Sequence, residues 1–409
     1  MKKIFIPMLF TILILGACTK SDEVKTGIWR GIIPTKGGNL PFNFEVSQDS
    51  SGYAVYILNG DDKLKMDKSF VKDDSLHIPM ELFDAELIAK VDGDKMNGIF
   101  RKKRSDLSTL QAPFSAEFGK TYRFFDESVK PKNQIAGKYA VTFLSEDKQD
   151  TTASVGVFEQ NGNKLKGTFL TATGDYRFLE GNVSDNDSLY LSCYEGNHVY
   201  LFKAKIEGDK LVGGEFWANI SGLETWTATK DENAKLPDAN SLTFLKDGAK
   251  SISFSFQNQD GKTVSLNDDK YKNKVVVVQI MGSWCPNCMD ETKFLSPWYK
   301  KNKDRGVEII GLAYEKSAEP SFAYPKIKRL KERFSIDYEV LLGGTNDKEE
   351  AAKSLPMLNH ILSFPTTIFI DKKGIVRQIH TGFSGPGTGK YYDEFVSDFN
   401  TLIDKLVSE

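Results

Sequence analysis

Apolar and polar residues alternate over short runs throughout the first half of the chain. Residues 42–46 and 199–206 are two such runs, rich in aromatic and β-branched side chains. A period of two is typical of strands that bury one face and expose the other. Pairs that favour tight turns, such as Asn59-Gly60 and Glu207-Gly208, separate the runs. This pattern predicts small antiparallel β units, built as sandwiches or barrels.

The β half of the chain also contains an internal repeat. Residues 74–78 (DSLHI) resemble residues 187–191 (DSLYL), and residues 89–96 resemble residues 204–211. The shift between the copies stays near ~110 residues and drifts by only a few, as loop insertions in a duplicated unit produce. The sequence therefore predicts two copies of one β unit.

Beyond the β repeats, the pattern changes to strands that alternate with helices. Residues 275–280 are almost entirely apolar, as expected of a central parallel strand covered on both faces. Apolar positions at helical spacing predict helices over residues 286–303, 320–334 and 348–362. Strands and helices in alternation predict an α/β domain of three layers over residues 242–409.

The N-terminus has the features of a bacterial targeting segment. Two lysines precede an apolar run of secretory length, residues 4–15, which is typical of a signal peptide. The run ends in Leu-Gly-Ala-Cys at Cys18, and this ending resembles a lipoprotein signal. The resemblance implies that residues 1–17 are removed and that Cys18 is acylated, which leaves residues 18–25 as a tether. An ordinary secretory signal with a coincidental cysteine is the alternative.

A lipid anchor would place the protein in the cell envelope, at the periplasmic face of a membrane, on the outer membrane or at the cell surface. No later apolar run approaches the ~20 residues that a membrane-spanning helix needs. The formal net charge is −2, which argues against a basic surface for nucleic acid. Hydrophobic residues make up 40% of the chain, which is enough for folded domains.

Three cysteines remain after Cys18, and two of them are placed for chemistry. Cys193 lies in an alternating run and is expected to be a small buried side chain. Cys285 and Cys288 form a Cys-x-x-Cys pair between a predicted strand and a predicted helix. Zinc would need two more ligands, and the four histidines are not paired at zinc-binding spacing. A purely structural disulfide would not need the preceding strand and tryptophan, so we expect a redox pair without a metal or other cofactor.

A helix N-terminus favours the reactive form of these thiols. It carries about half a positive charge and free N–H groups, and both stabilise a thiolate. Pro286 suits the first helical position, because its missing N–H costs nothing there. We expect Cys285 to be the outward residue that attacks, and Cys288, one turn later, to resolve the mixed disulfide.

Motifs on both sides of the dithiol resemble one family. They are the Gly261-Lys262 turn with Val264-Ser265-Leu266, the Trp-Cys-Pro-Asn-Cys segment at 284–288, the Phe364-Pro365-Thr366-Thr367 segment and residues 382–389 (GFSGPGTG). Over residues 242–409 the chain is similar to the TlpA-like branch of the thioredoxin superfamily, which includes the ResA-type envelope reductases. The β units resemble domains that are fused to such redoxins in envelope lipoproteins and that have no settled activity.

This resemblance implies roles for individual residues. Pro365 would follow a cis peptide bond, face the dithiol and offer backbone groups to a bound substrate chain. The supporting residues of the site would be Trp284, Pro286, Phe364 and Pro365. Glu291 would tune the thiols and move protons, although its spacing also fits a surface position on the helix. Gln279 stands where cytosolic thioredoxins have a buried acid, so Glu291 or water would have to carry any proton.

The chain is thus predicted to be multidomain, with two repeated antiparallel all-β units followed by a thioredoxin-like α/β domain of three layers. Its expected parts are a signal peptide (1–17), a lipidated tether (18–25), two β units (26–130 and 131–230), a linker (231–241) and the redox domain (242–409).

The expected function is that of a membrane-anchored thiol-disulfide oxidoreductase. It would exchange disulfides with envelope proteins as a reductase and take electrons from an upstream membrane thiol donor. An oxidase or isomerase that uses the same site is the first alternative. A thiol peroxidase is disfavoured, because the Pro-x-x-x-Thr-x-x-Cys frame of peroxiredoxins is missing before Cys285. A third alternative makes the β units a binding module with exposed Trp217, Trp226 and Tyr194, and the redoxin an accessory.

Overall fold

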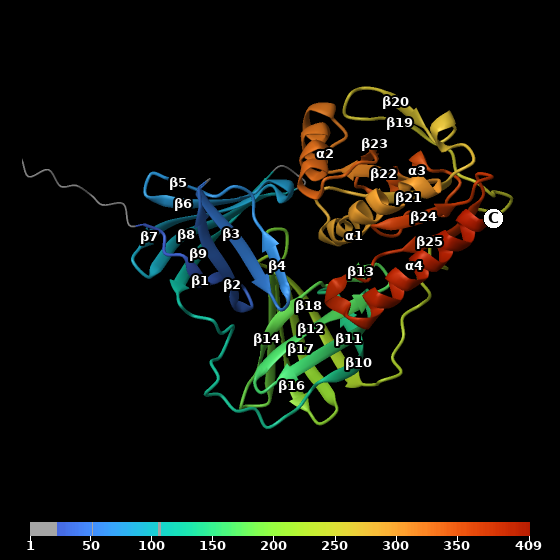
Figure 1. The fold of residues 1–409 in the computed structure, drawn as a ribbon. Coiled ribbons are helices and arrows are strands. Elements are labelled where there is room, and N and C mark those ends of the chain that lie inside the picture. Colours follow the sequence, from blue (N-terminus) through green and yellow to red (C-terminus); the bar gives the residue numbers. More distant parts are fainter. Residues whose placement is uncertain (1–22, 51, 105–107) are drawn as a thin grey trace, which may run out of the picture.

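The structure is a computed structural model in which residues 23–50, 52–104 and 108–409 are described. The predicted signal peptide and Cys18 lie outside the described residues. The described chain forms two β units and one α/β domain, which meet around a common centre (Figure 1). The prediction of a multidomain chain with two all-β units before an α/β domain is therefore confirmed. Within the described part, no helix is long and apolar enough to cross a membrane.

The first β unit is an antiparallel sheet that curves into a half-barrel, with strand order β4-β3-β2-β1-β9-β8-β7-β6-β5. Alternate residues of the strands point inward, and Trp29, Phe42 and Phe44 lie in the core. The described residues of β3 and of the segment before β5 share a single bridge, Tyr53–Ser69, so the sheet stays open along that edge. The strands are β1 (Gly27–Thr35), β2 (Gly38–Asp49), β3 (Gly52–Asn59), β4 (Asp62–Lys65), β5 (Phe70–Lys72), β6 (Ser75–Met80), β7 (Ala85–Asp92), β8 (Lys95–Lys103) and β9 (Thr109–Phe118).

The second β unit is a closed barrel. Its first strand pairs with its last, and the pairing of β12 with β14 completes the ring. Aromatic side chains such as Phe143, Phe169 and Phe202 fill the interior. The strands are β10 (Gly137–Leu144), β11 (Thr151–Asn161), β12 (Lys164–Thr171), β13 (Gly174–Asp175), β14 (Leu179–Val183), β15 (Ser188–Tyr194), β16 (Val199–Glu207), β17 (Lys210–Ala218) and β18 (Gly222–Lys230).

Equivalent points of the two β units have the same backbone conformation. In both units the first strand pairs with the last, β1 with β9 and β10 with β18. Asp74 and Asp187 both have a φ of 57°, and Gly93 and Gly208 have φ values of 58° and 59°. Matching positive φ angles at the repeated positions mean that the same turns recur. This correspondence supports the duplication inferred from the sequence.

The aromatic residues considered as an exposed binding surface are not exposed. Trp226 is 1% exposed inside the barrel, and Tyr194 is 0% exposed where the two β units meet. Trp217 is half-buried and lies so close to Gly37 that a Cβ there would be 2.1 Å from its ring. These rings fill space between packed strands, which is the usual role of large aromatic side chains. The alternative of an exposed aromatic surface is therefore wrong for Trp226 and Tyr194, which are core residues.

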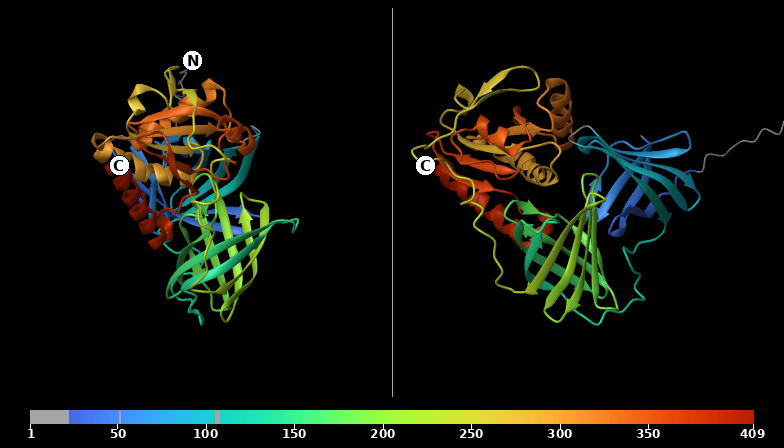
Figure 2. Two further views of the ribbon diagram at one scale, coloured as in Figure 1. Left: turned by 90° about the vertical axis from the view of Figure 1, so that its right-hand side faces the viewer. Right: turned by 180° about the vertical axis from the view of Figure 1, so that it is seen from behind.

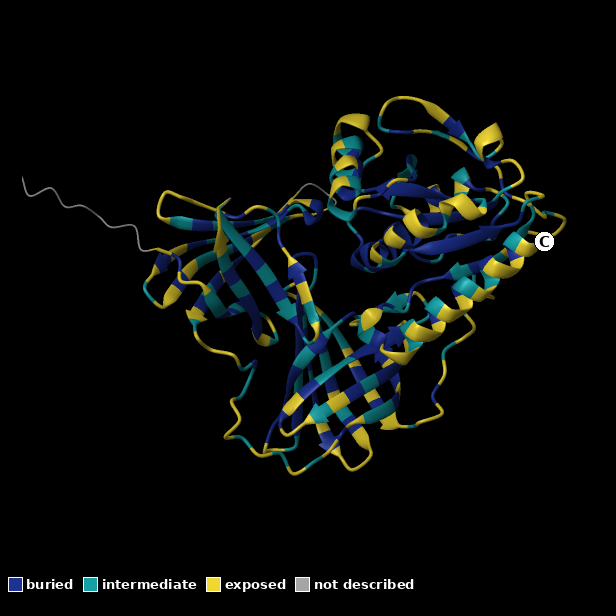
Figure 3. Ribbon diagram, in the orientation of Figure 1, coloured by how far each residue is buried: buried dark blue, intermediate teal, exposed yellow. Residues whose placement is uncertain are grey.

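The third domain is a thioredoxin-like α/β domain around a five-stranded mixed sheet. The strand order is β23-β22-β21-β24-β25, in which β24 and β25 run antiparallel to their neighbours. Strand β21 is buried along its whole length (Figure 3). The elements are β19 (Ser255–Gln257), β20 (Thr263–Ser265), β21 (Val275–Met281), α1 (Pro286–Asn302), β22 (Val307–Glu315), α2 (Pro320–Phe334), β23 (Glu339–Thr345), α3 (Lys348–Ser354), β24 (Thr366–Ile370), β25 (Val376–Thr381) and α4 (Lys390–Ser408).

One predicted helix is shorter than expected. Helix α2 has the predicted bounds, whereas α3 ends at Ser354 instead of residue 362. Pro356 explains the early end, because proline lacks an N–H donor and disfavours helical geometry in the residue before it.

The α/β domain is placed so that the start of α1 meets the β units. The connection from β18 to β19 runs along the outside of the molecule and brings the α/β domain back over both β units (Figure 2). Asp290, in the first turns of α1, contacts Arg177 of the barrel, and Arg177 in turn contacts Asp62 of the half-barrel. All three parts of the chain therefore meet at this end of α1.

Candidate active site

The dithiol lies where β21 ends and α1 begins. Cys285 is the N-cap of α1, and its Sγ accepts a hydrogen bond from the N–H of Cys288 at 3.2 Å. The two cysteines are joined by a disulfide, with their Cα atoms 5.2 Å apart. Pro286 takes the first helical position. When the pair is reduced, the helix N-terminus stabilises a thiolate on Cys285.

The Phe364-Pro365 segment lies directly beside the attacking sulfur. The peptide bond between these residues is cis, and the Phe364 carbonyl oxygen is 3.5 Å from Sγ of Cys285. The ring of Phe364 meets that of Trp284 edge to face, at 5.7 Å between centroids. The Trp284 indole donates to the Tyr314 carbonyl at 2.9 Å, which fixes its orientation. The structure thus brings Trp284, Phe364 and Pro365 together around Cys285.

Glu291 is buried one turn after Cys288, so its alternative placement on the helix surface is wrong. Its carboxylate accepts hydrogen bonds from the Gln279 amide at 2.8 Å and the Thr367 hydroxyl at 2.6 Å. Burial raises the pKa of Glu291 to about 7, although both hydrogen bonds act in the opposite direction. A carboxyl with that pKa can hold or release a proton near neutral pH. Its role in moving protons for the thiols stays a prediction.

A turn of the barrel contacts residues on both sides of the dithiol. The Asn287 side chain, between the two cysteines in sequence, donates to the Asp175 carbonyl at 3.0 Å. The Ser363 hydroxyl, just before Phe364, donates to the Thr173 carbonyl at 2.6 Å. Residues on both sides of the dithiol thus bind the same short segment of the barrel.

A buried ion pair reinforces this contact. The Arg177 guanidinium donates to both carboxylate oxygens of Asp290, at 2.6 and 2.9 Å. Burial alone would raise the pKa of Asp290, but Arg177 and Lys293 hold it below its ordinary value. Asp290 therefore stays ionised and bound to the barrel.

Little of the dithiol is accessible. Cys285 is 5% exposed and Cys288 is 0% exposed. Cys285 was expected to be the outward residue, and it is the more exposed of the two cysteines.

Sequence reasoning missed the residues that make this contact. Arg177, Asp175 and Thr173 showed no motif, and Asp290 was passed over in favour of Glu291 beside it. Arg177 and Asp290 are 113 positions apart in the chain, so no local pattern indicates that they meet.

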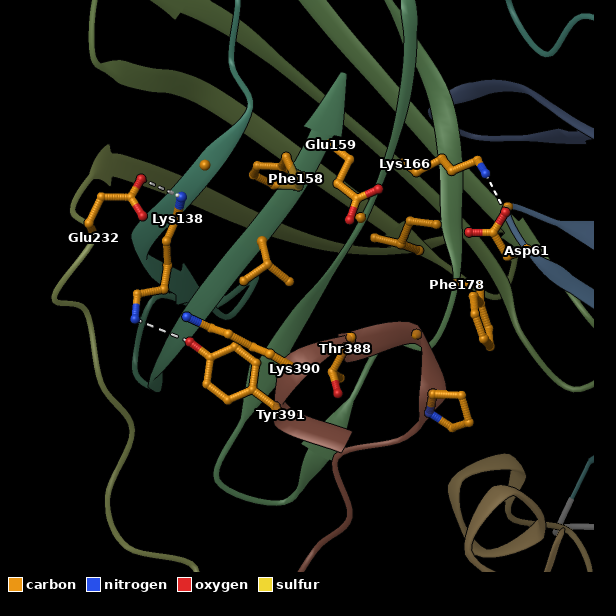
Figure 4. A pocket seen from close by; sticks show the side chains of 18 residues that line it. Asp61, Lys138, Phe158, Glu159, Lys166, Phe178, Glu232, Thr388, Lys390 and Tyr391 are labelled. Carbon is orange, nitrogen blue, oxygen red and sulfur yellow. Dashed lines mark hydrogen bonds and ion pairs between the residues drawn. The ribbon is translucent and has the colours of Figure 1, made fainter. Parts of the chain in front are cut away.

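Two other features lie apart from the dithiol. A groove of about 410 Å³ runs between the barrel and the start of α4, where Lys138 donates to the Tyr391 hydroxyl at 3.2 Å (Figure 4). Neither redox cysteine lines it. Cys193 is a free, buried thiol in the barrel, as its alternating context predicted. Within the described residues, no cluster of three or more histidine, cysteine or acidic side chains could hold a metal ion.

Comparison with known proteins shows which proteins the α/β domain is similar to. The AhpC/TSA family matches residues 248–379. Residues 248–379 are a redoxin domain. The thiol-disulfide oxidoreductase ResA of Geobacillus kaustophilus is 28% identical over 135 residues, which is 33% of this chain and 69% of that protein.

Two further similarities accompany this match. A chloroplastic peroxiredoxin Q of Suaeda salsa is 27% identical over 166 residues, covering 40% of this chain and 72% of its own. A solved thiol:disulfide interchange protein of the thioredoxin family from Chlorobium tepidum is 22% identical, with a TM-score of 0.30, and covers 39% of this chain and 96% of its own.

The redoxin domain makes the protein a thioredoxin-like thiol-disulfide oxidoreductase. The family match covers the segment that holds the Cys285–Cys288 disulfide and the cis bond before Pro365. The resemblance to the TlpA-like and ResA-type proteins agrees with these findings.

Proposed function

We propose that this protein is a membrane-anchored reductase of disulfides in proteins of the bacterial envelope. The observation that supports it best is the Cys285–Cys288 pair at a helix N-terminus beside the cis Phe364-Pro365 bond. The envelope location rests on the signal-like N-terminus and on Cys18. The reductase direction rests on the resemblance to ResA-type reductases. An upstream membrane thiol donor would return the pair to its dithiol form.

The proposed reaction has two exchange steps. The Cys285 thiolate attacks one sulfur of a substrate disulfide, a mixed disulfide forms, and the other substrate sulfur leaves as a thiolate. The Cys288 thiolate then attacks Sγ of Cys285 and releases the second substrate thiolate. Two electrons pass to the substrate, and the enzyme ends as the Cys285–Cys288 disulfide seen here.

Glu291 would serve the second step. The Cys288 thiol must lose its proton before it attacks, and a buried carboxylate with a pKa of about 7 can accept a proton at the pH of the reaction. Gln279 lies between Glu291 and the main chain of Cys288, because its amide donates to Glu291 at 2.8 Å and lies 3.4 Å from the Cys288 carbonyl oxygen. Glu291→Gln is expected to move the pH dependence of the resolving step and to leave alkylation of Cys285 unchanged.

The direction of the reaction is tested by the redox potential of the pair. The purified protein is equilibrated with reduced and oxidised glutathione, and the fraction in the disulfide form is measured by mass after alkylation. A reductase requires a potential well below that of the oxidant DsbA, about −120 mV. A value near that of DsbA would contradict the reductase direction and favour the oxidase or isomerase on the same site.

Substrates are found by trapping. Cys288→Ser leaves Cys285 without its resolving partner, so mixed disulfides with envelope proteins accumulate and can be identified by mass spectrometry. Cys285→Ser in the same background is the matched control, because it lacks the attacking sulfur. Equal capture by both variants would contradict a role for the dithiol.

A thiol peroxidase is the second candidate, favoured by the similarity to peroxiredoxin Q. A peroxidase would form sulfenic acid on Cys285 with hydrogen peroxide, and Cys288 would convert it to the disulfide with loss of water. Stopped-flow oxidation of the reduced protein distinguishes the two. A rate no faster than that of free cysteine excludes the peroxidase.

The anchor is tested separately. Cells fed a labelled fatty acid should label the wild-type protein, and Cys18→Ala should abolish the label and release the protein from the membrane fraction. Label that persists in Cys18→Ala would contradict the lipoprotein assignment and favour an ordinary secretory signal.

A further inference from the structure

The structure shows a dithiol that is almost wholly buried. Exchange requires a third sulfur to approach Cys285, yet Cys285 is 5% exposed and Cys288 is fully buried. Some part of the molecule has to move before the proposed reaction can start.

The barrel segment next to the dithiol is residues 172–177, here called the capping turn. Its Thr173 and Asp175 carbonyls accept hydrogen bonds from Ser363 and Asn287, at 2.6 and 3.0 Å. Thr173 lies in the tight turn between β12 and β13, and Asp175 lies in β13. The capping turn therefore presents two main-chain carbonyls to side chains on both sides of the dithiol.

We propose that the capping turn occupies the place of a substrate chain and must leave before a substrate binds. This inference rests on the proposed function and names its class of partner, a protein segment around a cysteine whose main-chain carbonyls are free. Ser363 and Asn287 donate to main-chain carbonyls, so they accept many side-chain sequences. A folded protein with its cysteines inside regular structure would not offer such carbonyls, because they are already hydrogen-bonded.

Buried charges hold the capping turn in place without making closure permanent. Arg177 binds Asp290 across the interface, and both side chains are buried. The Asp175 carboxylate accepts a hydrogen bond from the Gly385 N–H at 2.7 Å. Opening returns all these groups to water, so no charge is left buried without a partner. Closed and open arrangements are both physically accessible for that reason.

Glycine makes the close contact possible. A Cβ on Gly382 would lie 2.8 Å from the carbonyl carbon of Thr173, in the backbone of the capping turn. A Cβ on Gly174 would lie 2.5 Å from the Asn287 amide nitrogen. A methyl group at residue 382 would therefore force the capping turn away from the dithiol.

The first experiment measures how fast iodoacetamide alkylates Cys285 in the reduced full chain. Gly382→Ala adds the clashing methyl group. Gly374→Ala is the matched control, because its φ of +80° is close to the +77° of Gly382 and nothing lies within 4 Å of its added Cβ. Gly382→Ala should raise the rate about tenfold, since a strained contact of this kind shifts a closing equilibrium by that order. Equal rates in wild type and both variants would overturn the proposal.

The second experiment measures how fast wild type and variants reduce two disulfide substrates. One is an unfolded polypeptide joined to glutathione, and the other is bis(2-hydroxyethyl) disulfide, which has no peptide group. Ser363→Ala removes a donor that serves both the capping turn and a substrate chain. The preference in kcat/KM for the polypeptide should fall about fivefold, the size of one neutral hydrogen bond. Gly382→Ala keeps both hydrogen-bond donors, so it should raise kcat/KM for both substrates by the same factor.

The outcomes separate this inference from the proposed function. If Ser363→Ala changes both rates equally, the capping turn is a simple lid, and the mimicry of a substrate chain is refuted. If no variant and not even the wild type reduces either substrate, the proposed function fails. The alkylation rates would still decide whether the capping turn covers Cys285.

Discussion

The half-barrel meets its two neighbours in different ways. Its contact with the barrel is an extension of its own core, because Tyr194 of the barrel packs on Phe42 at 4.4 Å and on Phe100 at 5.6 Å between ring centroids. Its contact with the redoxin domain combines apolar side chains, where Met289 of α1 meets the half-barrel, with charged pairs such as Arg333–Asp67 at 3.0 Å and Lys316–Asp84 at 3.3 Å.

The difference follows from the open edge of the half-barrel. A closed barrel buries its inner face by itself, whereas an open sheet needs another element to cover its core. The barrel supplies that cover with β15, whose Ser192 hydroxyl also donates to the Pro41 carbonyl at 2.6 Å. The two β units are therefore expected to move as one body, and the more highly charged contact with the redoxin domain is where we expect the molecule to open.

Removing the Tyr194 ring should disrupt the apolar contact between the two β units. It is expected to change the free energy of unfolding more than any other variant proposed here. Tyr194→Ala deletes a fully buried ring, which costs about 3–5 kcal/mol for a large aromatic side chain. Amide hydrogen exchange should speed up across β1–β9, because the half-barrel core loses its cover. Tyr391→Ala, at the groove between barrel and α4, is the control, and a partly exposed ring should cost under about 1 kcal/mol. Similar exchange in both variants would show that the half-barrel is stable without the barrel.

Two adjacent acidic residues of α1 differ in the same way, because one contacts the barrel and the other lies in the core of the redoxin domain. Asp290 faces the barrel and is paired with Arg177, whereas Glu291 faces the redoxin core and has hydrogen bonds from Gln279 and Thr367. Burial raises the pKa of Glu291 from the ordinary 4.5 to about 7. The folded protein therefore holds this proton up to a higher pH than the unfolded chain does. The stabilisation is fully present below pH 4.5 and is lost as the pH rises through about 7.

Glu291→Gln tests this, because glutamine keeps the shape and cannot ionise. The stability of the variant relative to wild type should increase between pH 4.5 and about 7 and then level off. The total change should be about 3 kcal/mol. Urea unfolding of the oxidised protein at several pH values measures it. A difference that stays constant across this window would mean that Glu291 does not titrate there.

The difference between local contacts and contacts between domains also explains what the sequence could and could not predict. The turns and strands of the β units were readable because Gly93 and Gly208 mark them locally, at positive φ. The dithiol was readable because a buried strand, a cysteine pair and a helix start are adjacent in the chain. The sequence could not predict the open edge of one repeat and the closed ring of the other, because the repeats share the same local pattern and differ in whether β3 or β12 pairs along its second edge.

The covering of the site was hidden for a related reason. Asp290 and Glu291 look alike in sequence, and their different partners come from elements that are far away in the chain. Arg177 belongs to a turn of the barrel and has no neighbours that indicate a site. Only the packing of whole domains brings such residues together, and local patterns do not report it.

Added salt should affect the two contacts of the half-barrel differently, and this is the smallest of the expected effects. The Arg333–Asp67 and Lys316–Asp84 pairs are partly exposed, so added salt screens them, whereas an apolar contact is not weakened by screening. Raising sodium chloride to about 1 M should speed alkylation of Cys285 about two- to threefold, because exposed ion pairs contribute only ~0–1 kcal/mol each. Amide exchange in β1–β9 should not follow. Sucrose of equal osmolality is the control. If exchange in the half-barrel rises as much as alkylation, the two contacts are equally electrostatic, and the redoxin contact is not the one that opens.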